Sequence, residues 1–297
     1  MMRQKIQKRD NDTLLEGNLI TSQLEKRKLN LFIDISGTII IIFIFLFPFL
    51  WMVGMSFKDR IQTFQIPPAW FFKPTLENYR DLFSREIFGH YFVNSLLVVA
   101  FSVLISLLIA APAAYALSRF NFKAKKDFSF WILSVRMAPA ISVVIPYFLL
   151  GSLIGILDTK FVLILSYLTF NIPFAVWMLK GFISEIPIEI EEAAMVDGYS
   201  RFEVFYKIII PLTATGFAAT SILCIIQSWN EFTFALFLTT TNARTLPTIV
   251  TQFLTFQGVV WGEMSSAATI TVLPAVIFAI LVRKHLITGL TFGALKE

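Results

Sequence analysis

Residues 87–118 read IFGHYFVNSLLVVAFSVLISLLIAAPAAYALS and contain no Asp, Glu, Lys or Arg. A helix needs about 20 mainly apolar residues to cross the roughly 30 Å of hydrocarbon in a bilayer, and this stretch is longer than that. It therefore predicts a transmembrane helix, and it places the whole chain among the membrane proteins.

The composition of the 297 residues agrees with that class. Hydrophobic residues make up 56% of the chain, charged residues 15%, and the mean hydropathy is +0.72. The 32 Phe and 6 Trp carry more apolar aromatic surface than a soluble core hides, whereas lipid accepts it. A soluble globular protein is excluded.

Five further segments are long and apolar enough to span a bilayer, so the sequence predicts an all-α polytopic membrane protein with six transmembrane helices. One of them is interrupted only by Arg136, and several contain proline, for which we expect kinks. The six predicted spans are 35–57, 87–118, 128–151, 161–179, 208–230 and 264–282.

Lys and Arg in the connecting segments predict the orientation, because retained positive charge marks the cytoplasmic side. Seventeen of these residues lie on the side that carries both termini and seven on the other side. The interpretation is a multi-pass protein of a bacterial or archaeal cytoplasmic (inner) membrane with both termini in the cytoplasm. The net charge of +5 then reflects topology and anionic lipid headgroups rather than nucleic-acid binding.

Four segments describe the predicted domain organisation. Residues 1–30 are polar and form a cytoplasmic N-terminal lead, and residues 31–297 form the transmembrane domain. Within that domain, residues 184–207 form a cytoplasmic loop rich in acids, and residues 237–262 form an outer loop. The outer loop is nearly uncharged, so a seventh span is an alternative, but it would place the tail on the wrong side; we favour a loop or a re-entrant segment.

Several classes of chemistry are excluded by residues that the chain lacks. Cys224 is the only cysteine, and His90 and His285 are too far apart in the chain for an ordinary His/Cys metal site. No Gly is followed by Lys, so there is no phosphate-binding P-loop and any nucleotide hydrolysis belongs to another chain. We predict no catalytic residues, no metal and no cofactor in this chain.

The loop at 184–207 carries strong local signals for two helices. Pro187 suits the first position of a helix of about ten residues, and Gly198 suits its C-terminal end. Ser200 and Glu203 match a capping box, which predicts a second helix running through Pro211 into the fifth span.

The same loop contains a spaced motif. Residues 192–194 are Glu-Ala-Ala, Gly198 follows after three residues, and residues 208–211, Ile-Ile-Ile-Pro, follow after nine more. This pattern resembles the EAA loop of ABC-importer permeases, which is usually written EAA, three residues, G, nine residues, I-x-L-P. The resemblance implies that the helix enters a cleft of a cytoplasmic ATPase subunit, with Glu192 facing a basic residue there. The ATPase-coupling residues that it indicates are Glu191, Glu192, Ala193, Ala194, Asp197 and Gly198.

Other segments are similar to carbohydrate permeases of the maltose-importer type, smaller membrane subunit. They are Asn94-Ser95, Ala114-Tyr-Ala-Leu-Ser-Arg119, Trp229-Asn-Glu-Phe232 and Gly289-Leu-Thr-Phe-Gly-Ala-Leu-Lys296. This resemblance implies a non-enzymatic type I permease subunit that forms half of a translocation pathway. It also implies the partners: a second, related permease, two copies of an ABC ATPase that bind ATP and Mg²⁺, an extracytoplasmic solute-binding protein and a carbohydrate.

Arg136 is the most informative candidate for the substrate pathway. A charge inside a span costs at least about 2.5 kcal/mol unless it faces a cavity or a partner. Arg136 either lines a cavity and donates hydrogen bonds to sugar hydroxyls or a carboxylate, or it braces a gate near Pro139 by capping carbonyls. Further candidates are Tyr147, Asn171, Trp177, Gln227, Asn230 and Glu231. Glu231 is either an interfacial anchor beside Trp229 or a gate and a contact for the binding protein.

The substrate remains open between an oligosaccharide, with an acidic sugar as one option, and a small neutral sugar, polyol or glycerol phosphate. A secondary transporter is a more remote alternative, because it would need intramembrane acids that these spans almost lack. An intramembrane enzyme would need a buried nucleophile and base, and the sequence has no such arrangement.

Overall fold

The computed structural model of the protein describes residues 34–84, 86–255 and 258–294. It divides into two compact units, Met1–Gly54 and Met55–Glu297, which are considered separately. In the first unit the described residues belong to one long helix, Asp34–Ser56, which matches the first predicted span. The predicted lead at 1–30 lies outside the described residues.

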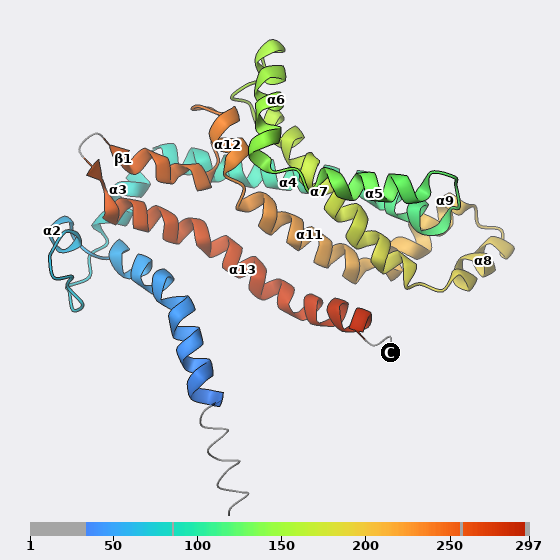
Figure 1. The fold of residues 1–297 in the computed structure, drawn as a ribbon, viewed down its shortest axis with the longest axis horizontal. Helices are drawn as coiled ribbons and strands as arrows, with labels where there is room; N and C mark the ends of the chain where they lie inside the picture. Colours follow the sequence, from blue (N-terminus) through green and yellow to red (C-terminus); the bar gives the residue numbers. More distant parts are fainter. Residues whose placement is uncertain (1–33, 85, 256–257, 295–297) are drawn as a thin grey trace, which may run out of the picture. The chain divides into compact units, whose positions relative to one another are not determined.

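Three long helices of the second unit correspond to predicted spans. They are α4 (Glu86–Arg119), α7 (Lys160–Ser184) and α13 (Trp261–Ala294), and α4 and α7 form the most extensive helix pair (Figure 1). Small side chains such as Ser106, Ala110 and Ala114 are fully buried on α4. Small residues let helix backbones approach closely, which is how membrane helices gain packing energy.

The third predicted span is broken rather than kinked. It consists of α5 (Lys125–Val135) and α6 (Ala140–Leu153), whose axes differ by 89°. Pro139 stands at the N-cap of α6 in an extended conformation, and a proline disfavours helical geometry in the residue before it. The break is sharper than the kink expected at the prolines, and Arg136 lies in the turn between the two helices rather than within a helix.

The fifth predicted span is also bent, by 74°. The chain runs through α9 (Arg201–Val204), the π-helical η1 (Phe205–Ile209) and α10 (Ile210–Leu212), then turns at Thr213 into α11 (Ala214–Trp229). Pro211 has no N–H for the helix and its ring crowds the carbonyl four residues earlier, in η1, which a wider π turn relieves. The predicted helix does run through Pro211, but it turns at Thr213 before the apolar helix α11 begins.

The segments predicted to lie on the outer side are short and irregular. Residues 58–84 hold only α2 (Arg60–Thr63) and α3 (Glu77–Ser84). Beyond α11 follow α12 (Thr233–Leu238), the 3₁₀ helix η2 (Leu246–Phe253) and an antiparallel pair of two-residue strands, β1 (Leu254–Thr255) and β2 (Gly258–Val259). In the described part of residues 237–262 no helix is long enough for a seventh span.

Candidate functional site

The predicted cytoplasmic loop folds as its local signals indicate. Helix α8 (Ile188–Val196) starts after Pro187, and Gly198 has a φ of +93°, a left-handed conformation that glycine adopts without strain. Ser200 and Glu203 then form the predicted capping box: the Glu203 N–H donates to Ser200 Oγ at 3.3 Å, and the Ser200 N–H donates to Glu203 Oε2 at 3.0 Å. Local sequence alone therefore specifies this helix, its turn and the next helix start.

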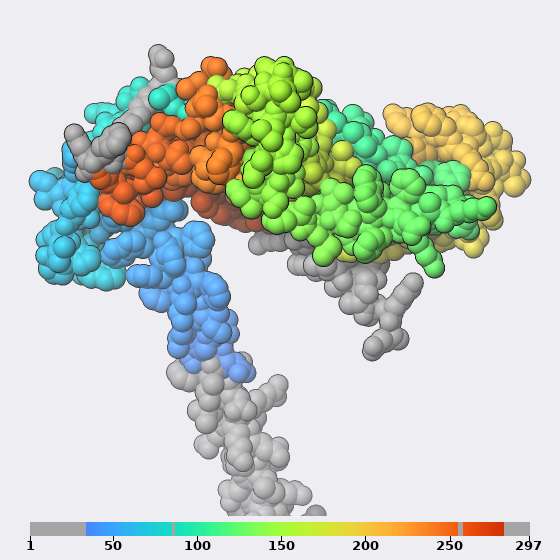
Figure 2. Space-filling model, turned by 45° about the horizontal axis from the view of Figure 1, so that its top comes forward, coloured from blue at the N-terminus to red at the C-terminus, as the bar shows by residue number. Residues whose placement is uncertain are grey.

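One face of α8 is exposed and carries both acids and apolar groups. Glu189, Glu192 and Ala193 are exposed, and so are Ile188 and Val196, the latter at 87%. Figure 2 shows α8 and α9, in yellow, at one end of the second unit, away from α3. We call this exposed face of α8 the coupling surface.

Glu191, in contrast, points into the protein. It is 3% exposed; the Tyr115 hydroxyl donates to its Oε2 at 2.8 Å, and Arg119 Nε donates to its Oε1 in an ion pair. Ala194 is buried on the same inward face. Of the predicted coupling residues, Glu192, Ala193, Asp197 and Gly198 are thus exposed, whereas Glu191 and Ala194 hold the helix from inside.

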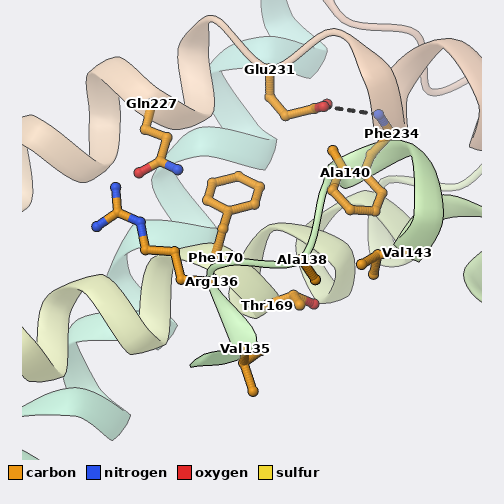
Figure 3. Close-up of a pocket in the computed structure, with 10 residues that line it drawn as sticks. All are labelled: Val135, Arg136, Ala138, Ala140, Val143, Thr169, Phe170, Gln227, Glu231 and Phe234. Carbon is orange, nitrogen blue, oxygen red and sulfur yellow. Dashed lines mark hydrogen bonds between the residues drawn. The ribbon is translucent and has the colours of Figure 1, made fainter. Parts of the chain in front are cut away.

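A cavity of about 220 Å³ lies where the break between α5 and α6 meets α7, α11 and α12. It unites three of the predicted pathway residues, Arg136, Gln227 and Glu231 (Figure 3). The rest of its lining is aromatic or small, and it comprises Val135, Ala138, Ala140, Val143, Thr169, Phe170 and Phe234. Aromatic faces beside a few amide and charged groups are a lining that suits a polyhydroxylated ligand.

Arg136 reaches this cavity from the turn between α5 and α6. Its guanidinium lies 4.4 Å from the centre of the Phe174 ring, a cation–π contact. Within the described ranges no backbone carbonyl accepts a hydrogen bond from the guanidinium, so the arrangement favours the cavity-lining interpretation over the carbonyl-capping brace.

Glu231 lies on the opposite side of the cavity. Its carboxylate accepts from the Phe234 N–H at 2.9 Å and the Ala235 N–H at 3.2 Å, which caps the start of α12 (Figure 3). Trp229 is 2% exposed, and its Nε1 donates to the Thr271 carbonyl at 3.0 Å. The pair does not form an interfacial anchor, because Trp229 belongs to the core.

The other pathway candidates lie elsewhere or act in packing. Asn171 is fully buried and donates to Ser228 Oγ at 2.8 Å, which ties α7 to α11. Trp177 is 58% exposed on α7, and Asn230 bonds the Ile226 carbonyl of its own helix. Tyr147 contacts the cavity indirectly, since its hydroxyl bonds Thr169 Oγ1.

The outer loop is held by a residue that sequence reasoning missed, Asp158. Its carboxylate accepts backbone N–H groups from Thr240 to Ala243 at 2.9–3.2 Å, and its own φ is +56°. Burial alone would raise the pKa of Asp158, but the backbone hydrogen bonds from Asn242, Thr240 and Ala243 outweigh it and hold that pKa well below its ordinary value. The signal in the sequence that could have indicated this role is a single acid, Asp158, in a turn that is otherwise uncharged.

The same loop is fixed from its other side by α4. His90 Nε2 bonds the Asn242 carbonyl at 2.7 Å, and Asn94 Nδ2 donates to the carbonyls of Asn242 and Arg244 at 2.9 and 3.0 Å. Ser95 Oγ accepts from the Leu246 N–H at 2.7 Å. This explains the polar Asn94-Ser95 pair within a long apolar stretch. Among the described residues no group of three or more His, Cys, Asp or Glu could hold a metal ion.

Comparison with known proteins places this architecture in a family. The model of the family described as binding-protein-dependent transport system inner membrane component matches residues 102–291. A probable ABC transporter permease of Sinorhizobium fredii, y4oR, is 38% identical over 86% of this chain and 92% of its own. The trehalose/maltose transport system permease MalG of Thermococcus litoralis is 37% identical over 88% of this chain and 95% of its own.

The fold has a match among solved structures. A chain in the crystal structure of a bacterial ABC transporter involved in the import of the acidic polysaccharide alginate superposes with a TM-score of 0.71. The match covers 85% of this chain and 94% of that chain at 22% identity, and it confirms the predicted importer-permease fold. The predicted class, a multi-pass transport component rather than an enzyme, is likewise confirmed, and the chain belongs to the family of binding-protein-dependent transport system inner membrane components.

Proposed function

We propose that this chain is one permease subunit of an ATP-driven, binding-protein-dependent carbohydrate importer. It forms half of the translocation pathway together with a second, related permease. Two copies of a cytoplasmic ABC ATPase bind ATP and Mg²⁺, and this chain binds neither. An extracytoplasmic solute-binding protein delivers the carbohydrate.

The coupling surface is the single observation that carries the proposal. Helix α8 presents Glu192 and exposed apolar side chains at one end of the second unit, where none of the described residues covers them. Exposed apolar groups rimmed by charge are typical of a protein interface. A basic cleft on an ATPase would suit this surface, and both termini would then lie on the same, cytoplasmic side.

The cavity beside Arg136 supports a carbohydrate as the substrate. Its aromatic, amide and charged groups suit the apolar faces and hydroxyls of a sugar ring. Its volume of about 220 Å³ is below the range of about 300–1,000 Å³ for drug-sized ligands, so it would hold part of an oligosaccharide at a time. The trehalose/maltose permease among the relatives agrees with a saccharide.

The test is purification of the tagged chain with its native partners, followed by ATPase and uptake assays with candidate sugar-binding proteins. We expect copurifying ATPase activity that one loaded binding protein stimulates. Glu192→Ala is expected to leave membrane insertion intact while abolishing ATPase binding or stimulated uptake. Asp127→Ala, an exposed acid at the start of α5, serves as the matched control. A chain that purifies without any ATPase would contradict the proposal.

A further inference from the structure

The coupling surface is attached to the rest of the second unit through a buried polar cluster, which we call the α8 clamp: Tyr115, Arg119 and Glu191. Glu191 is 3% exposed and receives the Tyr115 hydroxyl at 2.8 Å and the Arg119 ion pair. Arg119 Nη2 also donates to the Ile186 carbonyl at 2.8 Å, just ahead of α8. Two residues at the end of α4 thus hold both the start and the middle of the α8 region.

We propose that Tyr115 and Arg119 are positioning residues for energy coupling: by holding Glu191 they fix α8 to the end of α4, so that force applied to Glu192 moves α4 and α7 together. This inference rests on the proposed function. Glu191 and Glu192 are neighbours about 100° apart on the helix, so one faces inward and the other outward. Glu191 binds residues of this chain, and Glu192 is left exposed for the ATPase.

The α8 clamp also reaches the bent fifth span. The Tyr115 ring lies 5.0 Å, centre to centre, from Phe205, the first residue of η1, and 6.1 Å from Phe120. Tyr115 therefore contacts α8 through its hydroxyl and η1 through its ring. A displacement of α8 is transmitted to α4 through polar contacts and to the fifth span through aromatic packing.

The α8 clamp is better suited to fixing the orientation of α8 than to adding net stability. A buried ion pair contributes little net stability relative to apolar packing, because both ions lose their hydration. Its geometry is specific, however, because the planar guanidinium donates from two nitrogens in fixed directions, to Glu191 and to the Ile186 carbonyl. The apolar contacts of Ala194 and Met195 with the core are not directional, so they specify the rotation of α8 about its axis less closely than these hydrogen bonds do.

The experiment uses the full transporter complex in nanodiscs with the variants Tyr115→Phe, Glu191→Gln and Arg119→Lys. Two quantities are measured: hydrogen exchange of residues 188–196, and carbohydrate transported per ATP hydrolysed. Lys123→Gln, an exposed cation in the next loop, is the matched control. Tyr115→Phe keeps the ring packing and removes only one hydroxyl, so it remains informative if the charge variants fail to fold.

We expect faster exchange in 188–196 for all three variants and a fall of about fivefold or more in carbohydrate transported per ATP hydrolysed. In Tyr115→Phe, which keeps every charge of the α8 clamp, assembly with the ATPase should be retained. Lys123→Gln should change neither quantity. Wild-type exchange in the Tyr115→Phe and Glu191→Gln variants would overturn the clamp, and so would faster exchange with an unchanged ratio of transport to hydrolysis. If the wild-type complex transports no carbohydrate, the proposed function fails, whereas the exchange measurement still decides whether the clamp holds α8.

Discussion

Single acids carry much of the specific structure outside the spans. Asp158 gathers four consecutive backbone N–H groups of the outer loop, and Glu191 receives a hydroxyl and a guanidinium at the other end of the second unit. Asp158 fixes a loop that has no regular ladder of hydrogen bonds of its own, whereas Glu191 fixes a short helix, α8, to the end of α4. Replacing such an acid lowers the stability of the protein, because the groups that donate hydrogen bonds to it are left without an acceptor.

Replacing Asp158 by Asn should loosen the outer loop. Asn tolerates the left-handed backbone and keeps one acceptor, but it loses the charge that strengthens the hydrogen bonds. We expect a loss of about 1–2 kcal/mol in unfolding free energy at pH 7, and faster hydrogen exchange in residues 240–246. Asp158→Ala should lose more, and Asp127→Asn, an exposed acid, should lose almost nothing.

The contribution of Asp158 to stability should decrease on acidification. Because folding lowers the pKa of Asp158, its contribution is complete above the unfolded value of about 3.9 and disappears as the pH falls toward the folded value. The difference in thermal stability between the wild type and Asp158→Asn should stay constant from pH 8 to about 5 and shrink below about 4. A difference that grew on acidification would contradict this role.

At the scale of elements, two breaks shape the permease. The α5–α6 turn before Pro139 places Arg136 on the cavity, and the turn at Thr213 sets α11 against α7 and α13. The contact of α11 with α7 is very close at Gly216, which has no Cβ to collide with Phe182. The bend after Pro211 therefore depends on a glycine for its final packing.

Gly216→Ala should destabilise the protein. An added Cβ would lie 2.6 Å from Cδ2 and 2.9 Å from Cβ of Phe182, so the ring or the helix must move. Overpacking of this kind costs about 1–3 kcal/mol, which thermal unfolding of the purified complex would register. Gly181→Ala, on α7 with no atom within 4 Å of the new Cβ, is the control and should be neutral or slightly stabilising.

At the scale of the molecule, the cavity exists only where several elements meet. Arg136 comes from the turn after α5, Phe170 from α7 and Gln227 from α11 (Figure 3). Glu231 comes from the segment between α11 and α12, and Phe234 from the start of α12. Arginine and glutamate on opposite sides leave the cavity with balanced charge. This favours a ligand bound by hydroxyl groups rather than by a strong charge of its own.

Arg136→Gln tests the cavity as part of the pathway. Losing the charge and most of the donors should lower carbohydrate uptake by about tenfold, which corresponds to about 1.4 kcal/mol, while assembly with the ATPase is retained. Lys126→Gln, an exposed cation on α5, provides the comparison. Unchanged uptake and substrate preference in Arg136→Gln would remove Arg136 from the pathway.

Several features were predictable from the sequence because they depend on local chemistry. Apolar length specifies the spans through the thickness of the bilayer, and Pro187, Gly198 and the Ser200–Glu203 capping box specify α8 and its turn through backbone preferences. The motif at 192–211 indicated the family for the same reason, because its spacing is local.

Only the tertiary structure decided where the polar side chains meet. It turned Glu191 inward and Glu192 outward, and it separated Asn171 and Trp177 from the cavity. It also brought Arg136 and Glu231 to one cavity and bound residues 240–243 to Asp158. Asp158 and the backbone groups that it binds are separated by 82 to 85 positions in the sequence. Local backbone preferences do not specify a contact over such a separation. The sequence by itself determined the class, the span-forming segments and the short helix at 188–196. Three-dimensional packing decided the helix breaks, the cavity and the clamp, because each requires partners from distant segments.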